Sequence, residues 1–146
     1  MIDNLVMNAK QAMPNGGNLE VIAENVKLDE QNVYKLKPGD YVRIIFKDTG
    51  CGIPKDIIGK IFDPFFSTKQ MGSGLGLSIC YSIIQRHDGA IDVESEVGKG
   101  TTFYIFLPSA KPTTYQEVQN EKDTKKTFKG KVIVMDDEEF IRDYYK

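Results

Sequence analysis

The chain has 146 residues, which is the size of one ordinary globular domain. It carries 19 Lys and Arg against 21 Asp and Glu, a formal net charge of −2, which argues against a general nucleic-acid-binding protein with its basic excess. Its 2 cysteines form no CxxC pair and it has 1 histidine, which excludes a thiolate zinc site and does not favour a disulfide framework. Because no apolar run reaches membrane-spanning length and the start lacks a signal-peptide pattern, we expect this chain to be cytoplasmic and to make no membrane contact itself. A full-length parent anchored in a membrane stays an alternative.

The spacing of apolar residues predicts helices and strands up to residue 108. Apolar residues three and four positions apart indicate amphipathic helices over 1–13 and 75–87, and Pro54 favours a short helix over 54–61. Strands are predicted over 19–26, 41–47, 90–95 and 101–107, with hairpin connections between members of each pair. Hairpins combined with a few helices are typical of an α+β two-layer domain, which we predict over 1–108.

The composition changes after residue 108. Residues 109–130 hold Thr, Ser and Lys with almost no apolar side chains, which predicts a solvated linker. The segment 131–135 (KVIVM) then starts a new buried-strand pattern, followed directly by the acidic residues Asp136 and Asp137.

The first predicted helix carries two asparagines on one face. Asn4 and Asn8 lie four residues apart, so their side chains project in the same direction. They form either an ordinary polar face or a source of amide oxygen for Mg²⁺, which combines a few protein oxygens with substrate phosphates.

Two glycine-rich segments also suit a nucleotide. Asp48 ends a predicted strand and is followed by Gly50 and Gly52; a tight turn explains the glycines, and a carboxylate beside them suits an amino-bearing ring such as adenine. The segment 72–77 (GSGLGL) opens the second long helix, where backbone N–H groups favour phosphate. Lys69 precedes it and is placed to meet a phosphate. The segment is neither a dinucleotide fingerprint nor a P-loop.

The order of these motifs resembles the ATP-binding catalytic domain of sensor histidine kinases. The segments NLVMNA, DTGCGIP, FDPFFSTK, GSGLGLS and GKGTTFYIFLP follow one another over 1–108, and include the N, G1, F and G2 boxes of that family. The resemblance implies the Bergerat ATP-binding fold, a two-layer α/β sandwich whose mixed sheet carries helices on one face. It also implies ATP and Mg²⁺ as cofactors.

The resemblance assigns roles to individual residues. Asn8 matches the Mg²⁺-coordinating asparagine, Asn4 the companion polar position, and Asp48 the aspartate that reads the adenine amino group. Thr101 matches the threonine that supports this aspartate; it is favoured over the alternative Thr102 because it shares a strand face with apolar residues. The implied catalytic residues are Asn4, Asn8 and Lys69, the implied metal ligand is Asn8, and the implied cofactor-binding residues are Asn8, Asp48, Gly50, Gly52, Ile53, Lys69, Gly72, Ser73, Gly74, Leu75, Gly76, Leu77 and Thr101.

The same fold serves gyrase, MutL and Hsp90 ATPases, which place a glutamate as general base four residues before the metal asparagine. Asn4 occupies that position here, and an amide does not usefully accept a proton from water at neutral pH. We therefore favour a kinase that donates the γ-phosphate to a histidine on a separate dimerisation domain. A GHKL-type ATPase and a nucleotide-binding regulatory module without transfer activity stay as alternatives.

Two further features follow from the resemblance. Many members carry a basic residue where this chain has Gln11, so Lys69 is expected to carry more of the phosphate contact. The lone histidine, His87, is interpreted as structural and not as the phosphoacceptor, which in this family lies upstream of the N box.

The end of the chain resembles the first strand of a response-regulator receiver domain, with Asp136 and Asp137 as its metal-binding acidic pair. The implied parent is a hybrid kinase with a catalytic domain over 1–108, a linker over 109–130 and a truncated receiver start over 131–146. The implied partners are the histidine-containing dimerisation domain of the same kinase and a receiver domain or response regulator. We expect the chain alone to be a monomer.

Overall fold

The computed structural model describes residues 1–68 and 72–110. These residues fall within one compact unit, Met1–Lys111. Lys69, nearly all of the predicted linker 109–130 and the predicted receiver start 131–146 lie outside the described residues, so the statements about them stay predictions.

The chain forms two long helices and four strands in the described residues, each within two residues of its predicted bounds. They are α1 (Ile2–Ala12), β1 (Leu19–Leu28), β2 (Gly39–Asp48), α2 (Gly76–Arg86), β3 (Ala90–Glu96) and β4 (Gly100–Pro108), with one 3₁₀ turn, η1 (Ile58–Lys60), between β2 and α2.

The predicted short helix over 54–61 is wrong, because only η1 forms there. The backbone bonds from Ile57 N to Pro54 O (3.2 Å) and from Lys60 N to Ile57 O (2.9 Å) both span three residues, as in 3₁₀ turns. Gly59 lies inside this segment and has a poor helix propensity. A continuous α-helix is therefore not favoured over so few residues.

The sheet consists of two hairpins joined through their inner strands. β1 pairs with β2, β2 with β4, and β4 with β3, which gives the order β1-β2-β4-β3 with all three pairings antiparallel. The expected mixed sheet is therefore wrong for the described residues. β2 and β3, which α2 connects, do run in the same direction, but β4 lies between them and no parallel pair forms.

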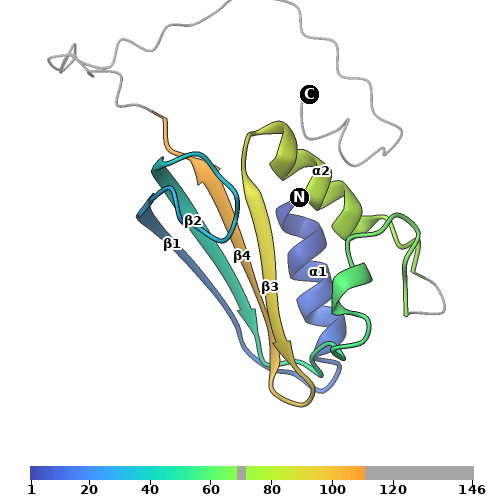
Figure 1. The fold of residues 1–146 in the computed structure, drawn as a ribbon. Helices are drawn as coiled ribbons and strands as arrows, with labels where there is room; N and C mark the ends of the chain where they lie inside the picture. Colours follow the sequence, from blue (N-terminus) through green and yellow to red (C-terminus); the bar gives the residue numbers. More distant parts are fainter. Residues whose placement is uncertain (69–71, 111–146) are drawn as a thin grey trace, which may run out of the picture. The chain divides into compact units, whose positions relative to one another are not determined.

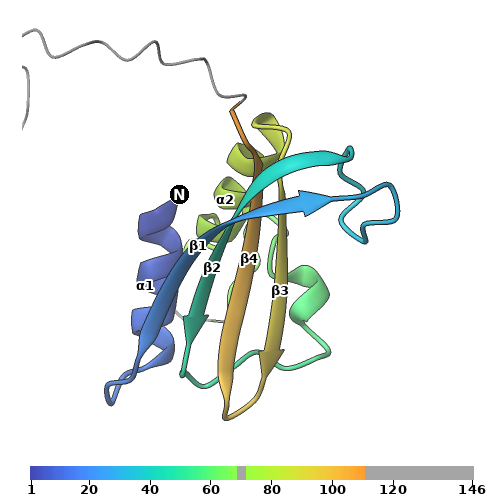
Figure 2. The ribbon, with the colours of Figure 1, turned by 90° about the vertical axis from the view of Figure 1, so that its left-hand side faces the viewer.

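Both long helices cover one face of this sheet (Figure 1), and the view turned by 90° shows the sheet face-on with α2 behind it (Figure 2). Apolar side chains from both layers meet in one core, made of Leu5, Phe46, Ile61, Cys80, Ile84, Phe103 and Ile105. Burying a large apolar side chain of this kind contributes about 1.5–3 kcal/mol relative to its exposure. The arrangement confirms the predicted α+β two-layer sandwich.

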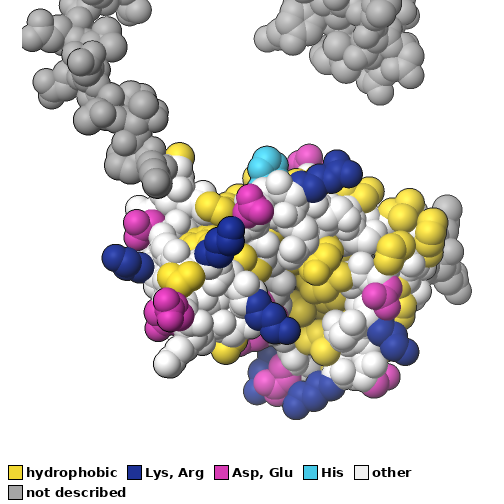
Figure 3. Space-filling view, turned by 45° about the horizontal axis from the view of Figure 1, so that its top comes forward, with side chains coloured by type: hydrophobic (Ala, Val, Ile, Leu, Met, Phe, Trp, Pro, Cys, Tyr) yellow, Lys and Arg dark blue, Asp and Glu magenta, His cyan; other side chains and the backbone are white. Residues whose placement is uncertain are grey.

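The connection between β1 and β2 folds back over the opposite sheet face. The ring centroid of Tyr34 lies 4.1 Å from that of Phe106, which is only 1% exposed. Nearby on the same face, Tyr104 donates a hydrogen bond of 2.9 Å to Glu94, and this bond to a carboxylate raises the pKa of Tyr104. On the surface seen in Figure 3, acidic and basic side chains are interspersed.

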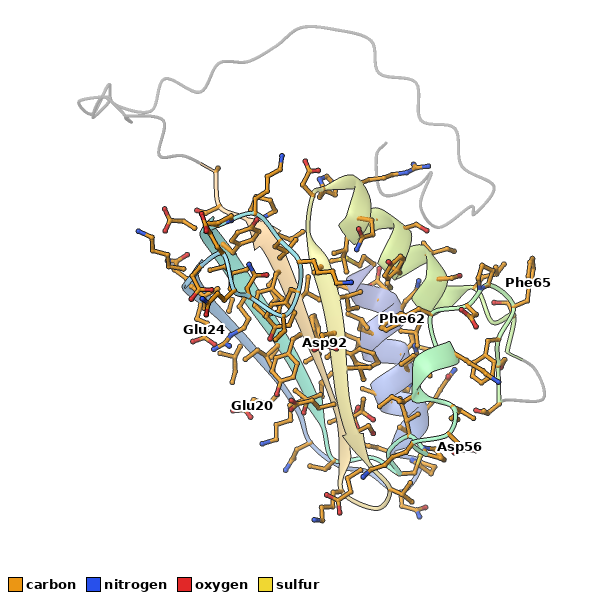
Figure 4. The ribbon with its side chains drawn as sticks, in the orientation of Figure 1. Glu20, Glu24, Asp56, Phe62, Phe65 and Asp92 are labelled. Atoms are coloured by element: carbon orange, nitrogen blue, oxygen red, sulfur yellow. The ribbon has the colours of Figure 1, made fainter. Side chains whose placement is uncertain are left out.

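The aromatic segment before α2 divides between core and solvent. Phe62 packs against Phe103 and Tyr81, at centroid distances of 6.4 Å and 5.8 Å. Phe65 is 77% exposed at the outer side of the loop, as Figure 4 shows. Among the helices that the structure describes, none combines the length and apolar character needed to cross a bilayer.

The two cysteines differ completely in accessibility, which gives a test of the fold. Cys51 is exposed, whereas Cys80 is 0% exposed and its Sγ donates to the Met1 carbonyl at 3.4 Å. Burial raises the pKa of the Cys80 thiol, so little reactive thiolate forms at neutral pH. Ellman's reagent should therefore titrate one thiol rapidly in the native chain and two in denaturant. Cys51→Ser should abolish the rapid phase; two rapid thiols in the native chain would contradict the helix packing described.

Candidate functional site

A pocket of about 450 Å³ lies between α1, the loop that follows β2 and the loop that leads into α2. Its volume is within the range typical of small-molecule sites. Most of the predicted site residues line it: Asn4, Asn8, Gly52, Ile53, Gly72, Ser73, Gly74, Gly76, Leu77 and Thr101. Asp48, Gly50 and Leu75 do not line it, and Lys69 lies outside the described residues.

Asp48, the last residue of β2, is fixed next to the pocket by two backbone donors. Its Oδ1 accepts hydrogen bonds from Gly50 N (2.8 Å) and from Thr101 N (3.2 Å), and the residue is 6% exposed. Within the described residues Oδ2 makes no hydrogen bond, and no fully buried side-chain oxygen or nitrogen lacks a partner. Oδ2 therefore keeps some accessible surface, and an ionised carboxylate is a strong acceptor for an N–H group.

Ser95, near the end of β3, connects the loop after β2 to the start of β4. Its Oγ accepts from Ile53 N (2.8 Å), donates to Gly100 O (2.9 Å) and lies 2.9 Å from Thr101 Oγ1. The strand register places Ser95 directly opposite Thr101, so the two hydroxyls meet on one face of the sheet.

Sequence reasoning missed Ser95. A signal was available, because the alternation along β3 puts Ser95 on the same face as the half-buried Ile91 and Val93. The partner of its hydroxyl depends on the register of the β3–β4 hairpin, which the sequence did not define.

The two asparagines of α1 form part of the pocket wall. Asn4 Nδ2 donates to the carbonyl of Gly76 at 3.0 Å, which joins the first turn of α1 to the first turn of α2. Asn8 lines the pocket one helical turn further along, whereas Leu5 and Ala9 are buried. Both asparagines therefore face the pocket, as their spacing predicted.

The pocket also meets the N-terminus of α2. This helix begins at Gly76, and its N-cap residue Leu75 makes no capping hydrogen bond with its side chain. The first N–H groups of a helix have no partner inside the helix and form a favourable end for an anion. Because Gly76 and Leu77 line the pocket, these donors are suited to a phosphate at this end.

Two glycines of the site are required by the packing of the chain itself. Gly74 has φ +67°, and a Cβ there would collide with the backbone of Phe65. Gly52 has φ +72°, and a Cβ there would collide with the backbone of Glu96 in the β3–β4 hairpin. Gly52 is therefore needed for this close approach of two backbones, whether or not a flat ring also approaches it.

Most of the apolar lining was also missed, apart from Ile53 and Leu77. Ile57 and Ile61 come from the turn around η1. Phe103 comes from β4, two residues after Thr101 and on the same face of the strand. A further set of residues completes the wall: Met7, Gln11, Ala12, Cys51, Pro54, Phe66, Ser67 and Thr68. The apolar residues Ile57, Ile61 and Phe103 provide a surface suited to a flat ring.

Comparison with known proteins assigns the chain to a family. Residues 1–111 match the family model described as histidine kinase-, DNA gyrase B- and HSP90-like ATPase. Sensor kinase CckA of Brucella abortus (strain 2308) is 41% identical over 95% of this chain, and the chain spans only 16% of that protein's length.

Solved structures of sensor histidine kinases share the fold. The catalytic domain of histidine kinase ThkA in a nucleotide-free form is 37% identical, with a TM-score of 0.55 over 72% of this chain and 61% of that one. Full-length ShkA in complex with AMPPNP is 27% identical, with a TM-score of 0.52 over 76% of this chain and 22% of that one. From its matched residues and its fold, the chain belongs to the family of histidine kinase-, DNA gyrase B- and HSP90-like ATPases.

Proposed function

We propose that this chain binds Mg·ATP and donates its γ-phosphate to a histidine on a separate dimerisation domain of a sensor kinase. The observation that carries the proposal is the carboxylate of Asp48 next to a pocket of about 450 Å³. Its Oδ1 accepts from two backbone N–H groups, while Oδ2 keeps accessible surface and makes no hydrogen bond within the described residues. An amino-bearing purine is complementary to this acceptor. Membership of the family and the likeness to ShkA in its AMPPNP complex support ATP as the nucleotide.

The phosphates are assigned to the opposite end of the pocket. The N–H groups at the start of α2 and the glycines 72–76 provide donors for phosphate oxygens. Lys69 is proposed to add a positive charge there, although it lies outside the described residues. A nucleotide would then extend from Asp48 to the first turn of α2.

The pocket residues also fit a magnesium ion held chiefly by phosphates. Asn8 lines the pocket with an amide oxygen, a ligand type that Mg²⁺ accepts alongside phosphate oxygens and water. In the residues that the structure describes, no group of three or more His, Cys, Asp or Glu side chains could hold a metal ion. When bound, Mg²⁺ would neutralise charge that develops on the transferring phosphate.

The chain's own residues are proposed to position the nucleotide and not to activate water. Asn4 stands where the ATPases of this fold carry the glutamate that acts as general base. Its amide nitrogen donates a hydrogen bond to Gly76 O. Phosphoryl transfer depends mainly on positioning and on charge stabilisation, so a histidine from a partner domain can act as the nucleophile. This favours a kinase over an ATPase.

The histidine of this chain is not proposed as the acceptor. His87 is the C-cap of α2, whereas Gly76 at the other end of the same helix lines the pocket. A helix of 11 residues is roughly 16 Å long, which separates the imidazole from the proposed phosphate end.

The tail is proposed to be the beginning of a receiver domain in a hybrid kinase, with a response regulator or receiver as the downstream partner. The alignment with CckA covers 95% of this chain, so it must include most of the residues after 108. This supports a kinase context for 109–146, including the acidic pair Asp136 and Asp137. A cytoplasmic location is part of the same proposal.

Asn8→Ala tests the magnesium assignment. Loss of one amide ligand should weaken Mg·ATP binding by roughly tenfold to a hundredfold in calorimetry, while binding of ATP in EDTA should change little. Asn25→Ala, an exposed substitution on β1, is the matched control. If Asn8→Ala binds Mg·ATP as the wild type does, Asn8 is not the metal ligand.

Transfer itself is tested with the whole chain, γ-labelled ATP and the purified histidine-bearing dimerisation segment of the parent. We expect acid-labile label on that segment, none on this chain alone, and the same transfer from a His87→Ala variant. Steady phosphate release by this chain alone would instead identify an ATPase. Nucleotide binding without either reaction would identify a regulatory module.

A further inference from the structure

We propose that Ser95 is a positioning residue that determines nucleotide specificity, because its hydroxyl forces the Thr101 hydroxyl to act as an acceptor toward the pocket. The inference rests on the proposed binding of a purine nucleotide in this pocket. It assigns a specificity role to a residue that lies outside the pocket lining and that contacts Thr101, which is part of the lining.

The hydroxyl of Ser95 makes three hydrogen-bond contacts. A serine hydroxyl has one hydrogen to donate and two lone pairs that can accept. The hydrogen goes to Gly100 O at 2.9 Å, since a carbonyl oxygen can only accept. One lone pair receives Ile53 N–H at 2.8 Å. In the remaining contact, of 2.9 Å, Thr101 Oγ1 must therefore be the donor.

Both donors of Thr101 are thus directed away from a ligand. Its backbone N–H is donated to Asp48 Oδ1 at 3.2 Å and its hydroxyl hydrogen to Ser95. Thr101 lines the pocket at 5% exposure, so any hydrogen bond that it makes with a ligand uses an oxygen lone pair. Thr101 therefore offers the pocket only an acceptor, and the carboxylate of Asp48 beside it is an acceptor as well.

These acceptors favour a purine with an amino group at its 6-position over one with an oxo group there. A 6-amino purine brings two N–H hydrogens on one nitrogen, whereas a 6-oxo purine brings an oxygen that also only accepts. If Ser95 lost its hydroxyl, the Thr101 hydroxyl would be released to rotate and donate to a 6-oxo group. Ser95 therefore acts against 6-oxo nucleotides without touching them.

The test compares ATP with ITP in calorimetric titrations of the full chain with Mg²⁺. ITP carries a 6-oxo group and an N1–H where ATP has a 6-amino group and an acceptor N1. The wild type should prefer ATP by about tenfold or more. Ser95→Ala should reduce this ratio by about fivefold, and Ser95→Thr, which keeps a hydroxyl, should restore it. Ser82→Ala, an exposed substitution on α2, is the control. Thermal unfolding checks that each variant is folded.

The same Ser95 substitution in a Thr101→Val variant distinguishes an effect on nucleotide specificity from a general structural effect. In Thr101→Val no hydroxyl can rotate, so adding Ser95→Ala should leave the ATP/ITP ratio within about twofold of that of Thr101→Val alone. Equal weakening of both nucleotides by Ser95→Ala, with an unchanged ratio, would overturn the proposal. If Ser95→Ala does not fold, Thr101→Ser should keep the wild-type ratio and Thr101→Val should lower it. Failure of the wild type to bind either nucleotide would refute the proposed function instead.

Discussion

The two backbone hydrogen bonds to Asp48 Oδ1 are the constraint on which the site depends. A buried carboxylate is costly unless it is hydrogen-bonded, and here the N–H groups of Gly50 and Thr101 meet that need. Gly50 belongs to the loop after β2 and Thr101 to the start of β4, so one oxygen joins the ends of two central strands. The contact between Ser95 and Thr101 connects β3 to the same network of hydrogen bonds. The orientation of Asp48 Oδ2 follows from these contacts.

The helix layer forms the other half of the pocket through a second cross-link. The hydrogen bond from Asn4 Nδ2 to Gly76 O connects α1 to the first turn of α2. It fixes the position of the two α1 asparagines relative to the N-terminus of α2. In the proposed function the strand ends read the base and the helix N-terminus receives the phosphates. The chain then supplies binding and orientation, and the nucleophile belongs to a partner.

The helices, the strands and 10 of the 21 residues that line the pocket could be predicted, because they depend on local patterns and motifs. Apolar periodicity defined α1 and α2, and the motif order indicated which polar residues meet. The two hairpins could be predicted, but the pairing of β2 with β4 could not, because it joins segments that are distant in the sequence. Ser95 was missed for the same reason, since its role arises from hairpin register. Gly52 was linked to ring approach, whereas its packing against Glu96 appears only in three dimensions.

The central claim is that a fixed Asp48 presents one acceptor to a purine, and Asp48→Asn tests it most directly. Gly50 N and Thr101 N would hold the amide oxygen of the new side chain, so its NH₂ group would take the place of Oδ2. Calorimetry with Mg·ATP and Mg·GTP should show the wild type preferring ATP by about tenfold or more, and Asp48→Asn losing or reversing that preference. An equal preference for ATP in both proteins would contradict the account.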